Sequence, residues 1–273
     1  MNLTTRMACL ASVMALAVTA GASAAPASAA RGSPEFRLKW QTSFSQPASL
    51  GSFADCDNDI HTTRPYCSRL PASLRTQWWA YPDGWPDTAT EEHYPVGGCY
   101  DPAATVWISG HQMHIRMWRG RTGSVHSAAL VPRAAIAQEY GEFTEAFRVS
   151  SVAAGYKSAH LLTPTGNLNY EIDFPEDSWD RTICAFDHGP ADGYESFCPD
   201  ARWTSWHTTM IVWVPGHVSF YLDGKLIGRS SLSPDGPMTW VIQNESALNG
   251  ETAAPGSHAQ MNISHVAVYA YKR

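Results

Sequence analysis

The sequence predicts an all-β protein in which two antiparallel sheets pack face to face as a sandwich or jelly roll. Many segments alternate apolar and polar residues with the period of two that is typical of half-buried strands. The one helix-like pattern, at residues 134–140, is short, and the chain shows no repeat with a period of about 20–50 residues. Together these observations favour a sandwich over a helical or repeat architecture.

The chain begins with the pattern of a secretory signal peptide. Arg6 precedes an apolar run at about residues 7–20, and two Ala-Ser-Ala cleavage sites follow it. We therefore expect residues 1–30 to be removed, with an approximate end, and residues 31–273 to form a single β-sandwich domain. The apolar run is too short for a transmembrane helix, so the sequence predicts a secreted, extracellular protein.

Composition limits the possible partners. The formal net charge is −6 and the chain contains no basic run, which argues against nucleic acid or an anionic membrane as a partner. A hydrophobic content of 44% is enough for a complete core. We expect a monomer.

Cysteine usage fits an oxidising compartment. Six cysteines are present, and Cys9 is lost with the signal peptide. Two local pairs are expected to form disulfides: Cys56 with Cys67, and Cys184 with Cys198. Cys99 is left over as a buried free thiol, because its surroundings show neither Cys-x-x-Cys nor Cys/His zinc spacing. The sequence thus predicts no metal site.

Residues 31–105 are rich in Pro, Gly, Asp and Trp, and we expect long loops there. Trp78, Trp79 and Trp85 lie in turn-rich surroundings. Such aromatics either close one end of a core or stack on a sugar ring. Core packing is favoured, because large aromatic side chains contribute most through buried area.

Strand patterns begin after this loop-rich part. In residues 111–119, Met113, Ile115 and Met117 share one face of a predicted strand. Asp223-Gly224 is typical of a two-residue hairpin turn. Further alternating sets are Phe143, Phe147 and Val149; Met210, Val212 and Val214; and Val218, Phe220 and Leu222.

The stretch at residues 170–176 contains three carboxylates in an otherwise apolar, β-prone run. Glu171 and Asp173 share one face of an extended strand, whereas Glu176 should point the other way. One extra residue between Asp173 and Glu176 would restore the phase, and Pro175 suits such a β-bulge. The three acids would then converge, with carboxyl groups close to the separation of about 5–5.5 Å typical of retaining glycosidases. The alternative is an ordinary solvated acidic face.

Residues 171–176 resemble the bulged E-x-D-x-x-E signature of glycoside hydrolase family 16. Residues 141–149, 206–213 and 218–224 also resemble family segments, and the match covers about residues 100–271. The resemblance implies a concanavalin A-like sandwich with a sugar cleft on its concave face. It also implies that Glu171 is the nucleophile and Glu176 the acid/base, with Asp173 between them.

The same resemblance implies further cleft residues and two departures. The expected substrate-binding residues are His160, His188, Trp240, Gln243 and Glu245. Within Lys157–Pro164, His160 is read as replacing a family tryptophan that stacks on sugar. Ser264 stands where many members carry an Asp that binds structural calcium, so calcium is not predicted and no cofactor is expected.

These patterns predict a secreted, endo-acting hydrolase of a β-linked polysaccharide with a retaining mechanism. The leading substrate by resemblance is β-1,3- or β-1,3-1,4-glucan, and agar- or carrageenan-type galactans remain open. The alternative from another class is a lectin-like module without catalysis, because a fold does not fix a function. The acid trio disfavours a lectin, since burying three carboxylates is costly unless they are used.

Overall fold

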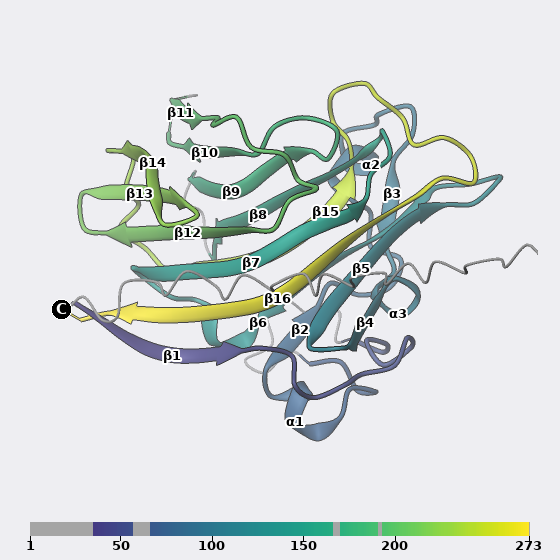
Figure 1. Ribbon diagram of the computed structural model, residues 1–273, viewed down its shortest axis with the longest axis horizontal. Coiled ribbons are helices and arrows are strands. Elements are labelled where there is room, and N and C mark those ends of the chain that lie inside the picture. The colour runs from purple at the N-terminus through teal and green to yellow at the C-terminus, as the bar shows by residue number, and fades with distance from the viewer. Residues whose placement is uncertain (1–34, 57–65, 166–169, 191–192, 273) are drawn as a thin grey trace, which may run out of the picture.

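The computed structural model describes residues 35–56, 66–165, 170–190 and 193–272, and most of these residues lie in β-strands (Figure 1). The predicted signal peptide lies outside the described residues. The strands are β1 Phe36–Thr42, β2 Trp78–Ala80, β3 Gly98–Tyr100, β4 Val106–Ser109, β5 Gln112–Arg119, β6 Val125–Pro132, β7 Gly141–Ser151, β8 Tyr156–Pro164, β9 Glu171–Ser178, β10 Cys184–His188, β11 Tyr194–Phe197, β12 His207–Val214, β13 His217–Leu222, β14 Lys225–Ser230, β15 Met238–Ser246 and β16 His258–Tyr271. The short helices are α1 Ala72–Arg75, α2 Thr88–Glu91, α3 Pro102–Thr105 and the 3₁₀ helix η1 Arg133–Ala135.

The strands form two layers that are continuous through β6. We call β11-β10-β9-β8-β15-β6 the front layer and β5-β16-β7-β12-β13-β14 the back layer, although β5, β16 and β7 lie nearer the viewer in Figure 1. One half of β6 pairs with β15 and the other half with β5. All pairings are antiparallel within the described chain except that of β3 with β6. The predicted all-β, jelly-roll class is confirmed.

The core lies between the two layers. The ring of Phe143 on β7 meets that of Trp240 on β15 edge-on, with centroids 5.6 Å apart. Phe174 on β9 packs in the same way against Phe220 on β13, at 5.7 Å. All four side chains are almost completely buried. The layers are therefore held by apolar burial, the dominant favourable term in folding.

Two local predictions about the strands have different outcomes. The hairpin at Asp223-Gly224 is confirmed, because both residues have positive φ angles and join β13 to β14. For β12 the sequence predicted the set Met210, Val212 and Val214, and this choice of face was wrong. Ile211 and Trp213 point into the core, whereas Met210 is half-buried on the other face. Both faces of this strand carry apolar residues, so alternation does not identify the buried one.

The loop-rich segment contains three strands that the sequence pattern did not predict, β1, β2 and β3, of which β1 is the longest. β1 pairs with β16 along its whole length. A register shift between Leu38 and Trp40 interrupts the alternation, and Leu38 is exposed. Since a bulge breaks the period of two, this strand has no clear pattern. Trp78 and Trp79 pack in the core, as favoured from the sequence.

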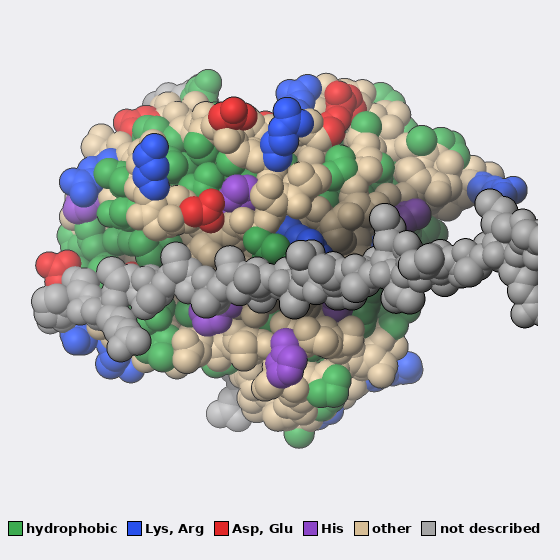
Figure 2. Space-filling view, in the orientation of Figure 1, with side chains coloured by type: hydrophobic (Ala, Val, Ile, Leu, Met, Phe, Trp, Pro, Cys, Tyr) green, Lys and Arg blue, Asp and Glu red, His purple; other side chains and the backbone are tan. Residues whose placement is uncertain are grey.

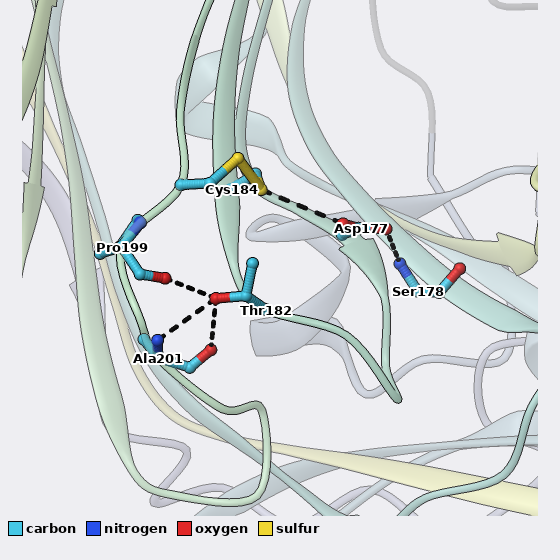
Figure 3. Close-up of a disulfide and its surroundings, with 7 residues drawn as sticks. Asp177, Ser178, Thr182, Cys184, Pro199 and Ala201 are labelled. Atoms are coloured by element: carbon cyan, nitrogen blue, oxygen red, sulfur yellow. Dashed lines mark hydrogen bonds between the residues drawn. A yellow bond between two sulfur atoms is a disulfide. The ribbon is translucent and has the colours of Figure 1, made fainter.

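Both predicted disulfides form, and Cys99 is a free, half-buried thiol. Figure 3 shows the Cys184–Cys198 bond at the start of β10. Beside it, the single proton of the Thr182 hydroxyl is shared between the carbonyl oxygens of Pro199 and Ala201 (Figure 3). The disulfide and these bonds fasten the open end of the β10–β11 hairpin.

Charged side chains are dispersed over the face drawn in Figure 2, where acidic and basic groups alternate with uncharged ones. Within the described residues, no helix has the length and apolarity needed to cross a membrane.

Candidate active site

A β-bulge in β9 sets the phase of the three acids. Asp173 lies opposite Leu161 of β8, and Glu176 lies opposite Ala159, so β9 advances one residue more than its neighbour. The pairing of β9 with β10 shows the same shift. The extra residue lies in the stretch that contains Pro175, as the sequence predicted. Proline is tolerated there because a bulge leaves one residue outside the ladder.

The acids lie at a pocket with a volume of about 520 Å³ on the front layer. Glu171 and Glu176 line it, and Asp173 is completely buried in β9 between them. The other lining residues are Tyr81, Trp85, Pro86, Thr88, Glu91, Glu92, Tyr100, Lys157, Ala159, Leu161, Thr163, His188, Gln243, Glu245 and Leu248. Strands β8, β9, β10 and β15 thus form one wall, and the segment around α2 forms the other.

Asp173 and Glu171 form a carboxyl–carboxylate pair. Burial, followed by the charges of Glu171 and Glu176, raises the pKa of Asp173 well above its usual value. Burial also raises the pKa of Glu171, but the hydrogen bond with Asp173 opposes this rise. The hydrogen bond between the two groups lowers the pKa of Glu171 and raises that of Asp173, as expected when Asp173 is the donor. Asp173 therefore keeps the shared proton and Glu171 carries the charge.

A buried lysine lies beside the acids. Lys157 Nζ is 2.9 Å from Glu176 Oε1 and 3.5 Å from Glu245 Oε1. Burial lowers the pKa of Lys157, but the charges of Glu245 and Glu176 outweigh burial, so the net shift is upward. The Glu245 carboxylate also accepts a hydrogen bond from the backbone N–H of Thr88 at 3.3 Å. This network ties β8, β9 and β15 to α2.

Three of the expected substrate-binding residues line the pocket. His188 Nε2 is 3.4 Å from Asp173 Oδ2. Gln243 donates to the Thr88 hydroxyl at 3.4 Å, and Glu245 is the partner of Lys157. Their role in substrate binding remains a prediction.

The assignment of His160 to the cleft is wrong. His160 is fully buried between the layers, where its Nδ1 contacts Glu145 Oε1 of β7. Side chains alternate along β8, so the residues that face the pocket are Lys157, Ala159 and Leu161. The neighbour of His160 that faces the pocket is therefore Leu161.

The assignment of Trp240 to the cleft is also wrong. Its ring packs against Phe143 across the core, and only 1% of the residue is exposed. The pocket-facing residues of β15 are Gln243 and Glu245. Trp240 is displaced from Gln243 by three positions, an odd number, so it lies on the opposite face.

Several pocket residues were not predicted from the sequence. Tyr81 and Tyr100 face the acids from the loop-rich segment, and Trp85, for which core packing was favoured, lines the pocket. Burial, followed by the charge of Glu171, raises the pKa of Tyr81 to about 12, so this phenol stays neutral. Only tertiary structure brings this segment to the acids. Lys157 could have been found, because a lysine in an apolar strand needs a counter-charge.

One group of residues has the composition of a metal site. Single ligand atoms of Asp173, Glu176 and His188 lie within 4.8 Å of one another. Lys157 already contacts Glu176, however, and its positive charge opposes a cation at that carboxylate.

Comparisons with known proteins identify the fold. No protein-family model matches the chain, and no curated protein matches it significantly. Solved structures do match it: the laminarinase from Rhodothermus marinus aligns with a TM-score of 0.64 and 19% identity over 87% of this chain and 98% of that one. A laminarinase catalytic domain from Thermotoga petrophila aligns at 0.62 and 14%, over 88% and 99%. A glycosyl hydrolase family protein from Mycobacterium fortuitum aligns at 0.61 and 17%, over 85% and 99%. The chain thus has the fold of these hydrolases.

Proposed function

We propose that this protein is a secreted glycoside hydrolase of family 16 type that cleaves β-linked glucan within the chain and retains anomeric configuration. The observation that carries the proposal is the bulged strand β9, which brings Glu171, Asp173 and Glu176 to one pocket. A glycosidase needs two carboxyl groups in opposite protonation states beside one glycosidic bond. The two disulfides are in keeping with an extracellular location.

In the first step, a Glu171 oxygen attacks the anomeric carbon. The bond from that carbon to the leaving oxygen breaks, and Glu176 donates its proton to that oxygen. The hydrogen bond from protonated Asp173 holds Glu171 in position and favours its charged form. The product is a covalent glycosyl-enzyme together with the released sugar chain.

In the second step, Glu176 removes a proton from water. The water oxygen bonds to the anomeric carbon, and the bond to Glu171 breaks. Lys157 lies against Glu176 Oε1, where its charge balances the negative charge that Glu176 carries after the first step. Two displacements at the same carbon restore the original configuration.

Glucan is the substrate class that we propose, because the similar structures named above include laminarinases, one of which is described as an endo-1,3-β-glucanase. The aromatic residues Tyr81, Trp85 and Tyr100 line the pocket and offer apolar surface to the C–H face of a sugar ring. Linkage preference, β-1,3 or mixed β-1,3-1,4, is a matter for assay.

The test is release of reducing ends from laminarin and lichenan, with agarose and carrageenan as alternative substrates. Glu171→Gln and Glu176→Gln should each lower turnover by several orders of magnitude while circular dichroism stays unchanged. Glu195→Gln is the matched control, because Glu195 lies in β11 of the same layer, where alternation points it away from the pocket. Binding of laminarin without cleavage by the wild type would instead identify a lectin.

Proton NMR of the first products tests the stereochemistry. A β-linked glucan should release the β-anomer before mutarotation occurs. Initial release of the α-anomer would show that the two carboxyl groups act with a water between them, as in inverting enzymes.

A further inference from the structure

An aromatic row continues the pocket wall beyond the acids. His188 of β10 lies opposite Glu171 of β9 on one side and opposite Tyr194 of β11 on the other. Residues directly opposite in an antiparallel pair point to the same face, so Tyr194 faces the same side as the acids. The rings of His188 and Tyr194 are 6.0 Å apart and inclined by 22°. Phe186 continues the row, 6.2 Å from His188 and inclined by 23°.

Tyr194 is the most exposed large hydrophobic side chain among the described residues, with 62% of its surface accessible. It lies on β11, the edge strand of the front layer. The Cys184–Cys198 disulfide closes the hairpin that carries it, so the ring has a fixed base. A large exposed aromatic ring at the rim of a pocket is typical of a binding surface.

The charge of the pocket indicates what kind of chain could lie there. Five glutamates line it, whereas the cations on the wall are Lys157 and, when protonated, His188. The glutamates are Glu91, Glu92, Glu171, Glu176 and Glu245. This excess of negative charge repels sulfate and carboxylate groups, so it disfavours sulfated and uronic polysaccharides.

We propose that Tyr194 is an outer glycan-binding platform, which holds a sugar ring of an uncharged β-glucan chain that leaves the pocket across β10 and β11. This inference rests on the proposed function for the direction of the chain and for the substrate. Tyr194 is two strands from Glu171, or roughly 10 Å at the usual strand spacing. A chain that occupies the acids must therefore extend past His188 before it reaches Tyr194, and short oligosaccharides should not sense this residue.

The experiment measures binding rather than cleavage. In a Glu171→Gln background, isothermal titration calorimetry follows β-1,3-linked gluco-oligosaccharides of increasing length and a sulfated carrageenan oligosaccharide. Tyr194→Ala should weaken binding of the longest oligosaccharides by about two- to tenfold and leave the shortest unchanged. Tyr194→Phe should bind like the parent, because the ring is kept. Tyr66→Ala is the matched control, since Tyr66 is 41% exposed and does not line the pocket.

The outcomes separate this inference from the proposed function. Equal loss for short and long oligosaccharides, no loss in Tyr194→Ala, or the same loss in Tyr66→Ala would overturn the platform. Tighter binding of the carrageenan oligosaccharide than of the glucan oligosaccharides would overturn the uncharged substrate class. If the wild type cleaves laminarin but Tyr194→Ala binds normally, only this inference fails. If Tyr194→Ala weakens binding as expected but the wild type does not cleave glucan, the platform stands and the hydrolase proposal fails.

Discussion

Replacement of Lys157 by methionine removes one buried charge and keeps the side-chain length. The ammonium group lies 2.9 Å from Glu176 and 3.5 Å from Glu245, and the side chain of Glu245 is only 1% exposed. At an effective dielectric constant of about 20, these separations correspond to gross attractions of about 6 and about 5 kcal/mol. Desolvation offsets much of this, so leaving the carboxylates unpaired should lower the free energy of unfolding by about 3–5 kcal/mol.

The pH dependence of this loss has a definite sign. Burial raises the pKa of Glu245, and Lys157 is the largest opposing influence, so the methionine variant should raise this pKa further, with only the hydrogen bonds from Thr88 left to oppose burial. An acid whose pKa is higher in the folded than in the unfolded state makes stability fall as pH rises from the unfolded toward the folded pKa. The deficit of Lys157→Met should therefore be largest near pH 7 and shrink toward about pH 4.

Urea unfolding of wild type and variant at a series of pH values measures this deficit. Adding Glu245→Gln to Lys157→Met should recover part of the loss, because the unpaired buried charge is removed. Lys225→Met is the control, since Lys225 is exposed on β14 and its loss should change stability by about 0.5 kcal/mol at most. A deficit below about 1 kcal/mol for Lys157→Met, or one independent of pH, would refute the reasoning.

Three further predictions follow from buried groups in the two layers. Burial raises the pKa of Asp187 to about 7, so the free energy of unfolding should fall between about pH 4 and pH 7, by up to about 4 kcal/mol for this group. Asp187→Asn should flatten this pH dependence in urea titrations. An unchanged slope in the variant would contradict the prediction. Replacing Cys184 and Cys198 by serine should lower the free energy of unfolding by about 3 kcal/mol, since the disulfide joins residues 14 positions apart. Equal thermal stability with and without the disulfide would argue against this. Trp240→Ala should cost about 3–5 kcal/mol but leave oligosaccharide affinity of the folded protein unchanged in calorimetry; weaker binding would return Trp240 to the cleft.

Local sequence predicted the parts of the fold that depend on short-range rules. Strand alternation, the Asp223-Gly224 turn and the two short disulfide loops all depend on neighbouring residues, and the structure confirms them except for the buried face of β12. The acid stretch could be interpreted because Pro175 marked the bulge. Strand alternation also predicted the all-β class, and the resemblance added the particular sandwich, which the structural likeness to known hydrolases supports.

The errors arose where periodicity alone cannot identify the buried face. His160 and Trp240 were placed in the cleft, yet each lies on the core side of its strand. In the front layer both faces are largely buried, one against the back layer and the other under the loop segment that carries Tyr81. Apolar and polar residues then occur on both faces, and the assignment of a residue depends on strand register and tertiary contacts.

The bulge in β9 brings the three acids to one face, and the strands on both sides of β9 fix the position of that bulge. In a regular strand, Glu171 and Glu176 would point to opposite faces, and one of them would lie in the apolar core. The extra residue brings all three acids to one face only if it lies between Asp173 and Glu176. Between Glu171 and Asp173 it would turn Asp173 to the other face, and outside residues 171–176 it would leave the two glutamates on opposite faces. Both neighbours record the shift in this interval, since β8 and β10 pair with β9 on either side of it. Moving the bulge would require both ladders to change register together, so the flanking strands fix the relative positions of the three acids.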